Sequence, residues 1–136
     1  MTVICTEAEA QLRSDAHARA WATIDLRALR ANLSLVRTTN PTCSLVVVVK
    51  ANAYGHGLIA VAGALRSQLR GRDCFGVATL DEALTLRRAG ITEPVLLLEG
   101  FVTAAELELI VQHGFHFVVH ALYQVEILRG YCASGK

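Results

Sequence analysis

One lysine near the middle of the chain lies in a setting that suits a reactive amine. The run from Leu45 to Lys50 is typical of a strand covered on both faces, and Gly55 and Gly57 follow it closely. Lys50 is therefore expected at the carboxyl edge of a sheet, where barrel enzymes keep their catalytic groups. Apolar walls favour the neutral form of a lysine amine, which attacks an aldehyde to give a Schiff base. The alternative is a strand-end lysine that only reaches solvent.

The elements that would position this lysine follow a repeating strand–helix pattern. Strands are predicted to start near residues 45, 74, 94 and 115, each followed by an amphipathic helix. The helices after the second and third of these strands begin with capping-box pairs, Thr79 with Glu82 and Thr103 with Glu106. The last helix is expected to end near Gly130. The pattern predicts an α/β fold with a parallel sheet and right-handed crossovers.

Two parallel architectures fit this pattern. One is a doubly wound open sheet, and the other is part of a (β/α)8 barrel. A complete barrel takes eight units and about 250 residues, whereas this chain has 136 residues and about four units. The barrel alternative therefore implies an incomplete barrel, and periodicity alone does not separate the two.

The composition argues against several classes of protein. Hydrophobic residues make up 53% of the chain and charged residues 18%, which is enough apolar surface for a packed core. The formal net charge is +1 without a basic block, so a nucleic-acid partner is not expected. The longest aliphatic run, 45–49, is far shorter than the roughly 20 residues that span a bilayer, so no membrane partner is expected.

The cysteines and histidines do not form a recognisable metal site. The four cysteines lie far apart in the chain and are predicted to be ordinary thiols in a reducing cytoplasm. On a strand, His116 and His120 share a face but stand about 13 Å apart, too far to hold one ion. We therefore expect no metal.

The residues around Lys50 resemble a known cofactor motif. The segment VVKANAYGHG, residues 48–57, is similar to the pyridoxal-phosphate attachment motif of alanine racemases. The flanking segments ATIDLRALRANL, FGVATLDEALTLRRAGI and PVLLLEGF also resemble that family, so the likeness covers roughly residues 19–128. It implies that 19–136 is the N-terminal part of a pyridoxal-phosphate-binding TIM barrel, incomplete in this chain. Residues 1–18 are expected to be a loosely ordered extension.

The resemblance implies roles for individual residues. Lys50 matches the lysine that forms the internal aldimine with pyridoxal 5'-phosphate and acts as the base facing the D-isomer. Tyr54 matches the motif tyrosine that helps to hold the cofactor phosphate. Val48 and Leu98, near two strand ends, are expected to lie against the cofactor, with an ordinary core position as the alternative for each.

The activity implied is the interconversion of L-alanine and D-alanine, which supplies D-alanine for peptidoglycan. The complete enzyme is expected to be a cytoplasmic homodimer with alanine as its small-molecule substrate. Two alternatives stay open: a racemase for serine or another small amino acid, and a non-enzymatic module, either a cofactor-binding protein or a partial chain that binds nothing.

The sequence departs from the family pattern at the second base. Racemisation needs an acid–base group on each face of the planar α-carbon, and the family places a tyrosine from a later part of the chain opposite the lysine. Tyr123 and Tyr131 do not lie in that motif. We predict that the 136 residues alone do not racemise alanine at a useful rate. Rapid solvent-deuterium exchange at the α-carbon with inversion, after adding cofactor and alanine, contradicts this prediction.

Overall fold

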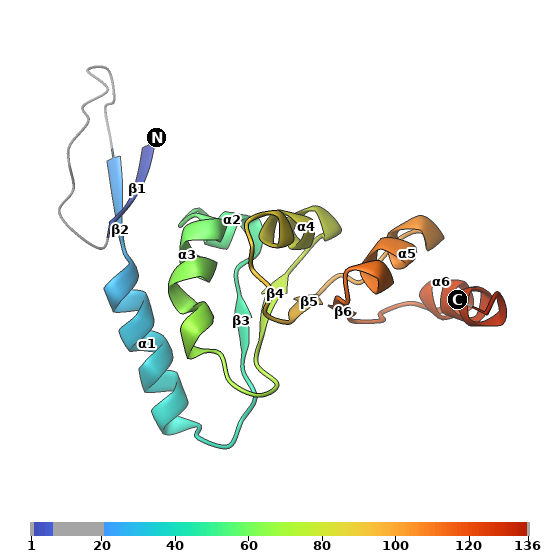
Figure 1. Ribbon diagram of the computed structural model, residues 1–136, viewed down its shortest axis with the longest axis horizontal. Coiled ribbons are helices and arrows are strands. Elements are labelled where there is room, and N and C mark those ends of the chain that lie inside the picture. The colour runs from blue at the N-terminus through green and yellow to red at the C-terminus, as the bar shows by residue number, and fades with distance from the viewer. Residues whose placement is uncertain (1, 7–20, 136) are drawn as a thin grey trace.

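The computed structural model describes residues 2–6 and 21–135, and its centre is a four-stranded parallel sheet. The strands pair in chain order, β3 (Val46–Val48), β4 (Cys74–Val77), β5 (Val95–Leu97) and β6 (His116–Phe117). Each strand is followed by a helix, as the strand–helix pattern predicts. Figure 1 shows the strands side by side, with β3 and α6 far apart.

In chain order, the helices are α1 (Leu26–Thr39), α2 (Lys50–Tyr54), α3 (Leu58–Leu65) with the 3-10 turn η1 (Arg66–Gln68), α4 (Leu80–Arg88), α5 (Ala104–Gln112) and α6 (Leu122–Ala133). Both predicted capping boxes are present, at the starts of α4 and α5. Among the described residues, no helix is long and apolar enough to cross a bilayer.

The core lies between the sheet and its helices. Alternate strand residues point into it, and Phe75, Val77 and Leu97 have no solvent-exposed surface. They belong to one buried cluster with apolar residues of α3, α4 and α5, such as Leu86 and Leu107. Because side chains alternate along a strand, these residues all point to one face of the sheet, which is buried, while the residues between them point to the opposite face.

The opposite face of β3 corrects the expectation that this strand is covered on both faces. Val46 and Val48 are 46% and 38% exposed, whereas Val49 is 1% exposed. The helices that the structure describes cover one face of the sheet, so in the aliphatic run 45–49 positions 45 and 47 are half-buried, position 49 is buried, and positions 46 and 48 are exposed. An uninterrupted run of valines does not report which face a neighbour covers.

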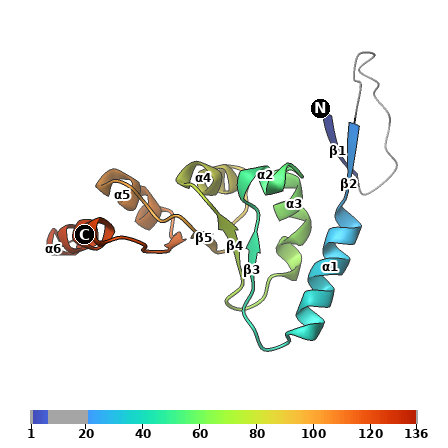
Figure 2. The same cartoon turned by 180° about the vertical axis from the view of Figure 1, so that it is seen from behind.

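A second, two-stranded sheet precedes the α/β units. Strand β2 (Trp21–Asp25) leads into α1, and β1 (Thr2–Thr6) pairs with it in parallel. Both strands lie at the α1 end of the molecule, far from α6 (Figures 1 and 2). The expected loose extension over 1–18 thus includes a five-residue strand, because β2 offers an unpaired edge to which it can bond. Residues 7–18 of this extension lie outside the described part of the chain.

The last helix differs from its predicted end. Helix α6 continues through Gly130 to Ala133, and Gly135, with φ of 74°, follows it. Gly130 has no positive φ and takes a place inside the helix. Glycine ends a helix only where the backbone turns left-handed, and here that residue is Gly135 rather than Gly130.

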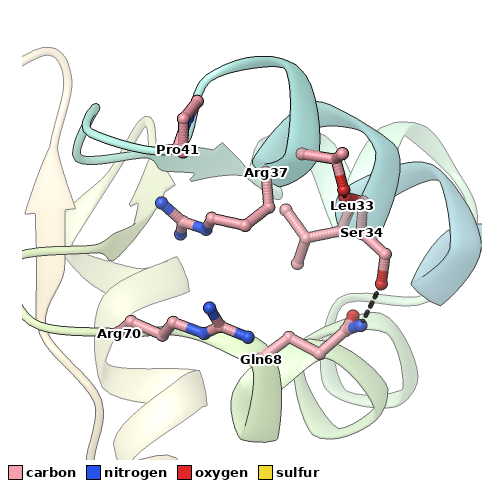
Figure 3. Close-up of a pocket in the computed structure, with 7 residues that line it drawn as sticks. Leu33, Ser34, Arg37, Pro41, Gln68 and Arg70 are labelled. Atoms are coloured by element: carbon pink, nitrogen blue, oxygen red, sulfur yellow. Dashed lines mark hydrogen bonds between the residues drawn. The ribbon is translucent and has the colours of Figure 1, made fainter.

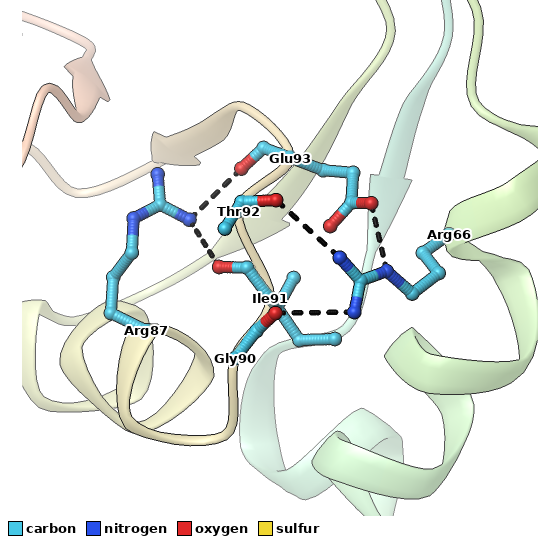
Figure 4. Close-up of polar contacts among 6 residues, drawn as sticks. All are labelled: Arg66, Arg87, Gly90, Ile91, Thr92 and Glu93. Atoms are coloured by element: carbon cyan, nitrogen blue, oxygen red, sulfur yellow. Dashed lines mark hydrogen bonds and ion pairs between the residues drawn. The ribbon is translucent and has the colours of Figure 1, made fainter.

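A cluster of arginines fixes the connection between α4 and β5 (Figure 4). Arg66 pairs with Glu93 at 2.8 Å and donates to the Gly90 carbonyl at 3.1 Å. Arg87 donates to the carbonyls of Ile91 and Glu93, at 2.7 and 2.9 Å. Burial raises the pKa of Glu93, but the hydrogen bond and positive charge of Arg66, together with backbone N–H groups of Thr92 and Glu93, outweigh it and leave the pKa below its usual value.

A buried carboxylate fixes the start of β3. Asp73 is 2% exposed and accepts hydrogen bonds from the backbone N–H groups of Leu45 and Arg70, both at 2.8 Å. The Arg37 guanidinium of α1 forms an ion pair with the same carboxylate. Burial raises the pKa of Asp73, but the two N–H groups and Arg37 together hold it below its ordinary value of 3.8.

We predict that Asp73→Asn lowers the free energy of unfolding by about 2–4 kcal/mol at pH 7, because it leaves Arg37 with a neutral partner. The folded carboxyl has the lower pKa, so its contribution is complete above 3.8 and is lost as pH falls through the folded pKa. Urea unfolding at several pH values should therefore show the two proteins converging in acid. The exposed Asp81→Asn change is the control, with an expected loss below about 1 kcal/mol. A gap that does not change with pH contradicts the account.

Candidate active site

Lys50 lies where the sequence places it, at the carboxyl end of β3. The Val49 N–H donates to the Gly76 carbonyl at 2.8 Å, so the parallel ladder continues to the residue before the lysine. Lys50 then opens α2 and is half-buried. The starts of α2 and α4 lie at the same end of the sheet (Figure 1).

The backbone after Lys50 makes a left-handed turn. Four consecutive non-glycine residues, Ala51 to Tyr54, have φ between 52° and 55°, and Gly55 follows with φ of 85°. Each left-handed residue with a Cβ costs roughly 1–2 kcal/mol. Runs of this kind therefore persist only where other contacts hold them. The sequence gives no sign of this turn, because alanine and tyrosine are ordinary helix residues.

Asn52 closes the turn from within. Its carbonyl accepts hydrogen bonds from the N–H groups of Gly55 and Gly57, at 3.1 and 2.9 Å. Its side-chain Oδ1 accepts from the Leu58 N–H at 2.8 Å, at the first residue of α3. That N–H at the start of α3 is thus already bound within the turn. His56 Nδ1 lies 2.9 Å from the Ala53 carbonyl.

A carboxylate from the next strand–helix unit reaches the same turn. Glu82, the third residue of α4, accepts a hydrogen bond from the Ala51 N–H at Oε1, with a distance of 2.7 Å. Its Oε2 accepts from the N–H groups of Ala78 and Thr79, at 2.8 and 3.3 Å. Capping-box spacing predicts the bond to Thr79, but no local pattern reports the bond to Ala51, 31 residues away.

Val48 and Leu98 both flank Gly76 of β4. A Cβ built on Gly76 would be 3.5 Å from both Val48 Cγ2 and Leu98 Cδ1 and 2.8 Å from Val46 Cγ1. These three side chains can lie this close to the strand only because residue 76 has no side chain of its own. His120 Nε2 lies 2.6 Å from the Leu98 carbonyl, a contact that the sequence did not suggest.

Tyr54 lies at the rim, where its side chain is 61% exposed. With Val48 and His56 it borders a mostly apolar hollow of about 200 Å³ beside β3. Leu98 does not line this hollow. Val48 thus shares this hollow with Tyr54 and lies with Leu98 around Gly76, but no one hollow contains both Tyr54 and Leu98.

A larger pocket of about 420 Å³ lies away from these residues, between α1 and η1 (Figure 3). Arg37 and Arg70 reach into the same space, and Gln68 donates to Ser34 Oγ across it at 2.8 Å. Arg37 is already bound to Asp73 and to the Cys43 carbonyl. This pocket contains none of the predicted site residues.

The chain can be compared with known proteins on this geometry. The family described as "Alanine racemase, N-terminal domain" matches residues 24–136, which include Lys50 and every described helix. The chain belongs to the alanine racemase family. It is 53% identical to the alanine racemase of Pseudomonas fluorescens over 109 residues and 52% identical to that of Chromohalobacter salexigens over 110 residues. These matches cover 80% and 81% of the chain but 29% of each relative, so the chain spans under a third of their length.

Solved structures of the family agree with the fold. The alanine racemase of Acinetobacter baumannii superposes with a TM-score of 0.73 at 38% identity, over 79% of this chain and 29% of that one. That of Bartonella henselae, described with covalently bound pyridoxal phosphate, has a TM-score of 0.72 at 32% identity, over 82% and 31%. The described units are thus the N-terminal part of a TIM barrel, and the doubly wound alternative is wrong.

We predict that Asn52→Ala lowers the free energy of unfolding by roughly 1–2 kcal/mol, because it removes the bond to Leu58 and an amide side chain that tolerates the left-handed region. Asn52→Gly removes the same bond but relieves the backbone strain, so its loss should be smaller. Urea titrations of the two variants compare them directly. Equal losses contradict the assignment of strain to this turn.

Proposed function

We propose that this chain supplies the Schiff-base lysine of a pyridoxal-phosphate-dependent alanine racemase. The observation that carries the proposal is Lys50 at the carboxyl end of β3, followed at once by the left-handed turn of the family motif. Identity of 50% or more to curated alanine racemases over four fifths of the chain supports the same substrate.

The residues around Lys50 suit such a cofactor. Val48 and Leu98 present apolar side chains on either side of Gly76, and a planar ring packs against a surface of this kind. Tyr54 is 61% exposed, so its side chain would be accessible to a phosphate group at this edge of the sheet. When bound, the cofactor supplies an electron sink that stabilises a carbanion at the substrate α-carbon.

The chain's own contribution is made by Lys50 Nζ. Its neutral amine would hold the cofactor through a C=N bond to the aldehyde carbon, with the carbonyl oxygen and the two amine hydrogens leaving as water. As a free amine, Lys50 would accept a proton from, or deliver one to, one face of the substrate α-carbon. Lys50 follows the last residue of β3, which places its amine at the carboxyl end of the sheet. The second face of the α-carbon requires a different group.

The wider setting follows from the family. We infer that the protein acts as a cytoplasmic homodimer with alanine as its substrate and that its product serves peptidoglycan synthesis. A solved histidine racemase of Leuconostoc mesenteroides superposes with a TM-score of 0.65 at 27% identity, so the same barrel units also occur with another amino acid. The higher identity to alanine racemases favours alanine here.

Reductive trapping tests the proposal. The chain contains two lysines, Lys50 and Lys136, so labelling of one can be compared with labelling of the other. We expect that pyridoxal phosphate followed by borohydride labels Lys50 well in excess of Lys136, as read by peptide mass spectrometry. Lys50→Arg keeps the positive charge but cannot form the imine, so it should abolish the main label. Lys136→Arg is the matched control and should leave the label in place.

Two outcomes contradict the proposal. One is equal labelling of both lysines, which indicates unspecific amine chemistry. The other is a label on Lys50 that does not decrease when inorganic phosphate and free pyridoxal are both added in excess. That result indicates that no cofactor site is involved.

A further inference from the structure

Glu82 differs from an ordinary helix cap because its two oxygens serve two different loops. Oε2 accepts from the N–H groups of Ala78 and Thr79, in the loop that precedes its own helix. Oε1 accepts from the N–H of Ala51, in the loop after β3. One carboxylate therefore ties the end of β3 to the end of β4.

The loop that Glu82 reaches is the strained one. Ala51 is the first left-handed residue and directly follows Lys50. The N–H of Ala51 belongs to the same peptide unit as the Lys50 carbonyl. A hydrogen bond to this N–H therefore fixes the orientation of the peptide plane between Lys50 and Ala51. An acceptor on another element then opposes relaxation of the turn toward a right-handed conformation, which is favoured by roughly 1–2 kcal/mol per residue.

Two neighbouring helices show what this position does elsewhere. Glu106 occupies the same place on α5, and its Oε2 accepts from Val102 and Thr103, at 2.6 and 3.4 Å, within its own loop. Gln124 on α6 accepts from the His120 N–H through Oε1 at 2.7 Å and donates from Nε2 to the Phe101 carbonyl at 2.8 Å.

The comparison explains why position 82 carries a carboxylate. Gln124 faces N–H groups on one side and a carbonyl on the other, which an amide can satisfy. Glu82 faces N–H groups on both sides, and a glutamine there would set its NH₂ against the N–H of Ala51. A glutamine can keep the cap on α4 but must lose the bond to the lysine loop.

We propose that Glu82 is a positioning residue that holds the left-handed turn and thereby the orientation of Lys50 toward its aldehyde cofactor. This inference rests on the proposed function for its consequence, but its structural part concerns Ala51 alone. Glu82 contacts neither substrate nor cofactor in this account and acts through the backbone of residues 50 and 51.

The test compares Glu82→Gln with Glu106→Gln, which alters the equivalent cap on a loop without the lysine. Amide hydrogen exchange, resolved by NMR on the whole 136-residue chain, should be faster at Ala51 in the first variant by roughly three- to tenfold. It should be unchanged at Ala51 in the second. Thermal unfolding of the two variants shows whether they lose similar stability.

The chemical readout is the rate of borohydride-trapped labelling of Lys50 across a range of pyridoxal phosphate concentrations. In Glu82→Gln we expect the rate at saturating cofactor to fall roughly three- to tenfold while the half-saturating concentration changes less, because the lost bond orients the amine rather than the phosphate. Labelling of Lys136 is the internal reference. Glu106→Gln should keep the rate of the unmodified chain.

The outcomes separate this inference from the proposed function. If the unmodified chain is not labelled at Lys50, the proposed function fails, and Ala51 exchange alone decides whether Glu82 holds the turn. If Ala51 exchange or the saturating rate is the same in both variants, the positioning role is overturned even where Lys50 is labelled.

Discussion

The left-handed turn after Lys50 is the constraint on which the site depends. Four residues with a Cβ hold φ values between 52° and 55°, a conformation that an isolated chain avoids. Asn52 closes the turn from within, and Glu82 holds its first N–H from the next strand–helix unit. For the Schiff-base role that we propose for Lys50, a strained but over-determined backbone would fix the direction in which the amine is presented.

The two ends of the sheet have different roles. At the amino end, the ion pair of Arg37 with the buried Asp73 joins α1, β3 and the loop before β4, and no predicted site residue lies there. At the carboxyl end, hydrogen bonds such as that from Ala51 to Glu82 join neighbouring loops. The buried ion pair thus lies at the end opposite the proposed site, which agrees with the usual division of roles in parallel α/β barrels.

Local sequence signals predicted the elements well, because each depends on neighbouring residues. The capping boxes at Thr79 and Thr103 and the order of strands and helices all follow from spacing over a few residues. Features that depend on contacts between distant segments were not accessible. The bond from Glu82 to Ala51 joins residues 31 apart, and the exposed face of β3 depends on which neighbours cover it. Lys50 itself became a candidate through the motif, since physics alone left a solvent-facing lysine open.

The central claim is that Lys50 captures an aldehyde cofactor beside Val48 and Leu98. A crystal structure of the chain after reduction with pyridoxal phosphate and borohydride tests it most directly. The account predicts continuous electron density from Lys50 Nζ to the cofactor, with the ring against Val48 and Leu98. Density attached to Lys136, or a ring that lies away from the carboxyl end of β3, contradicts it.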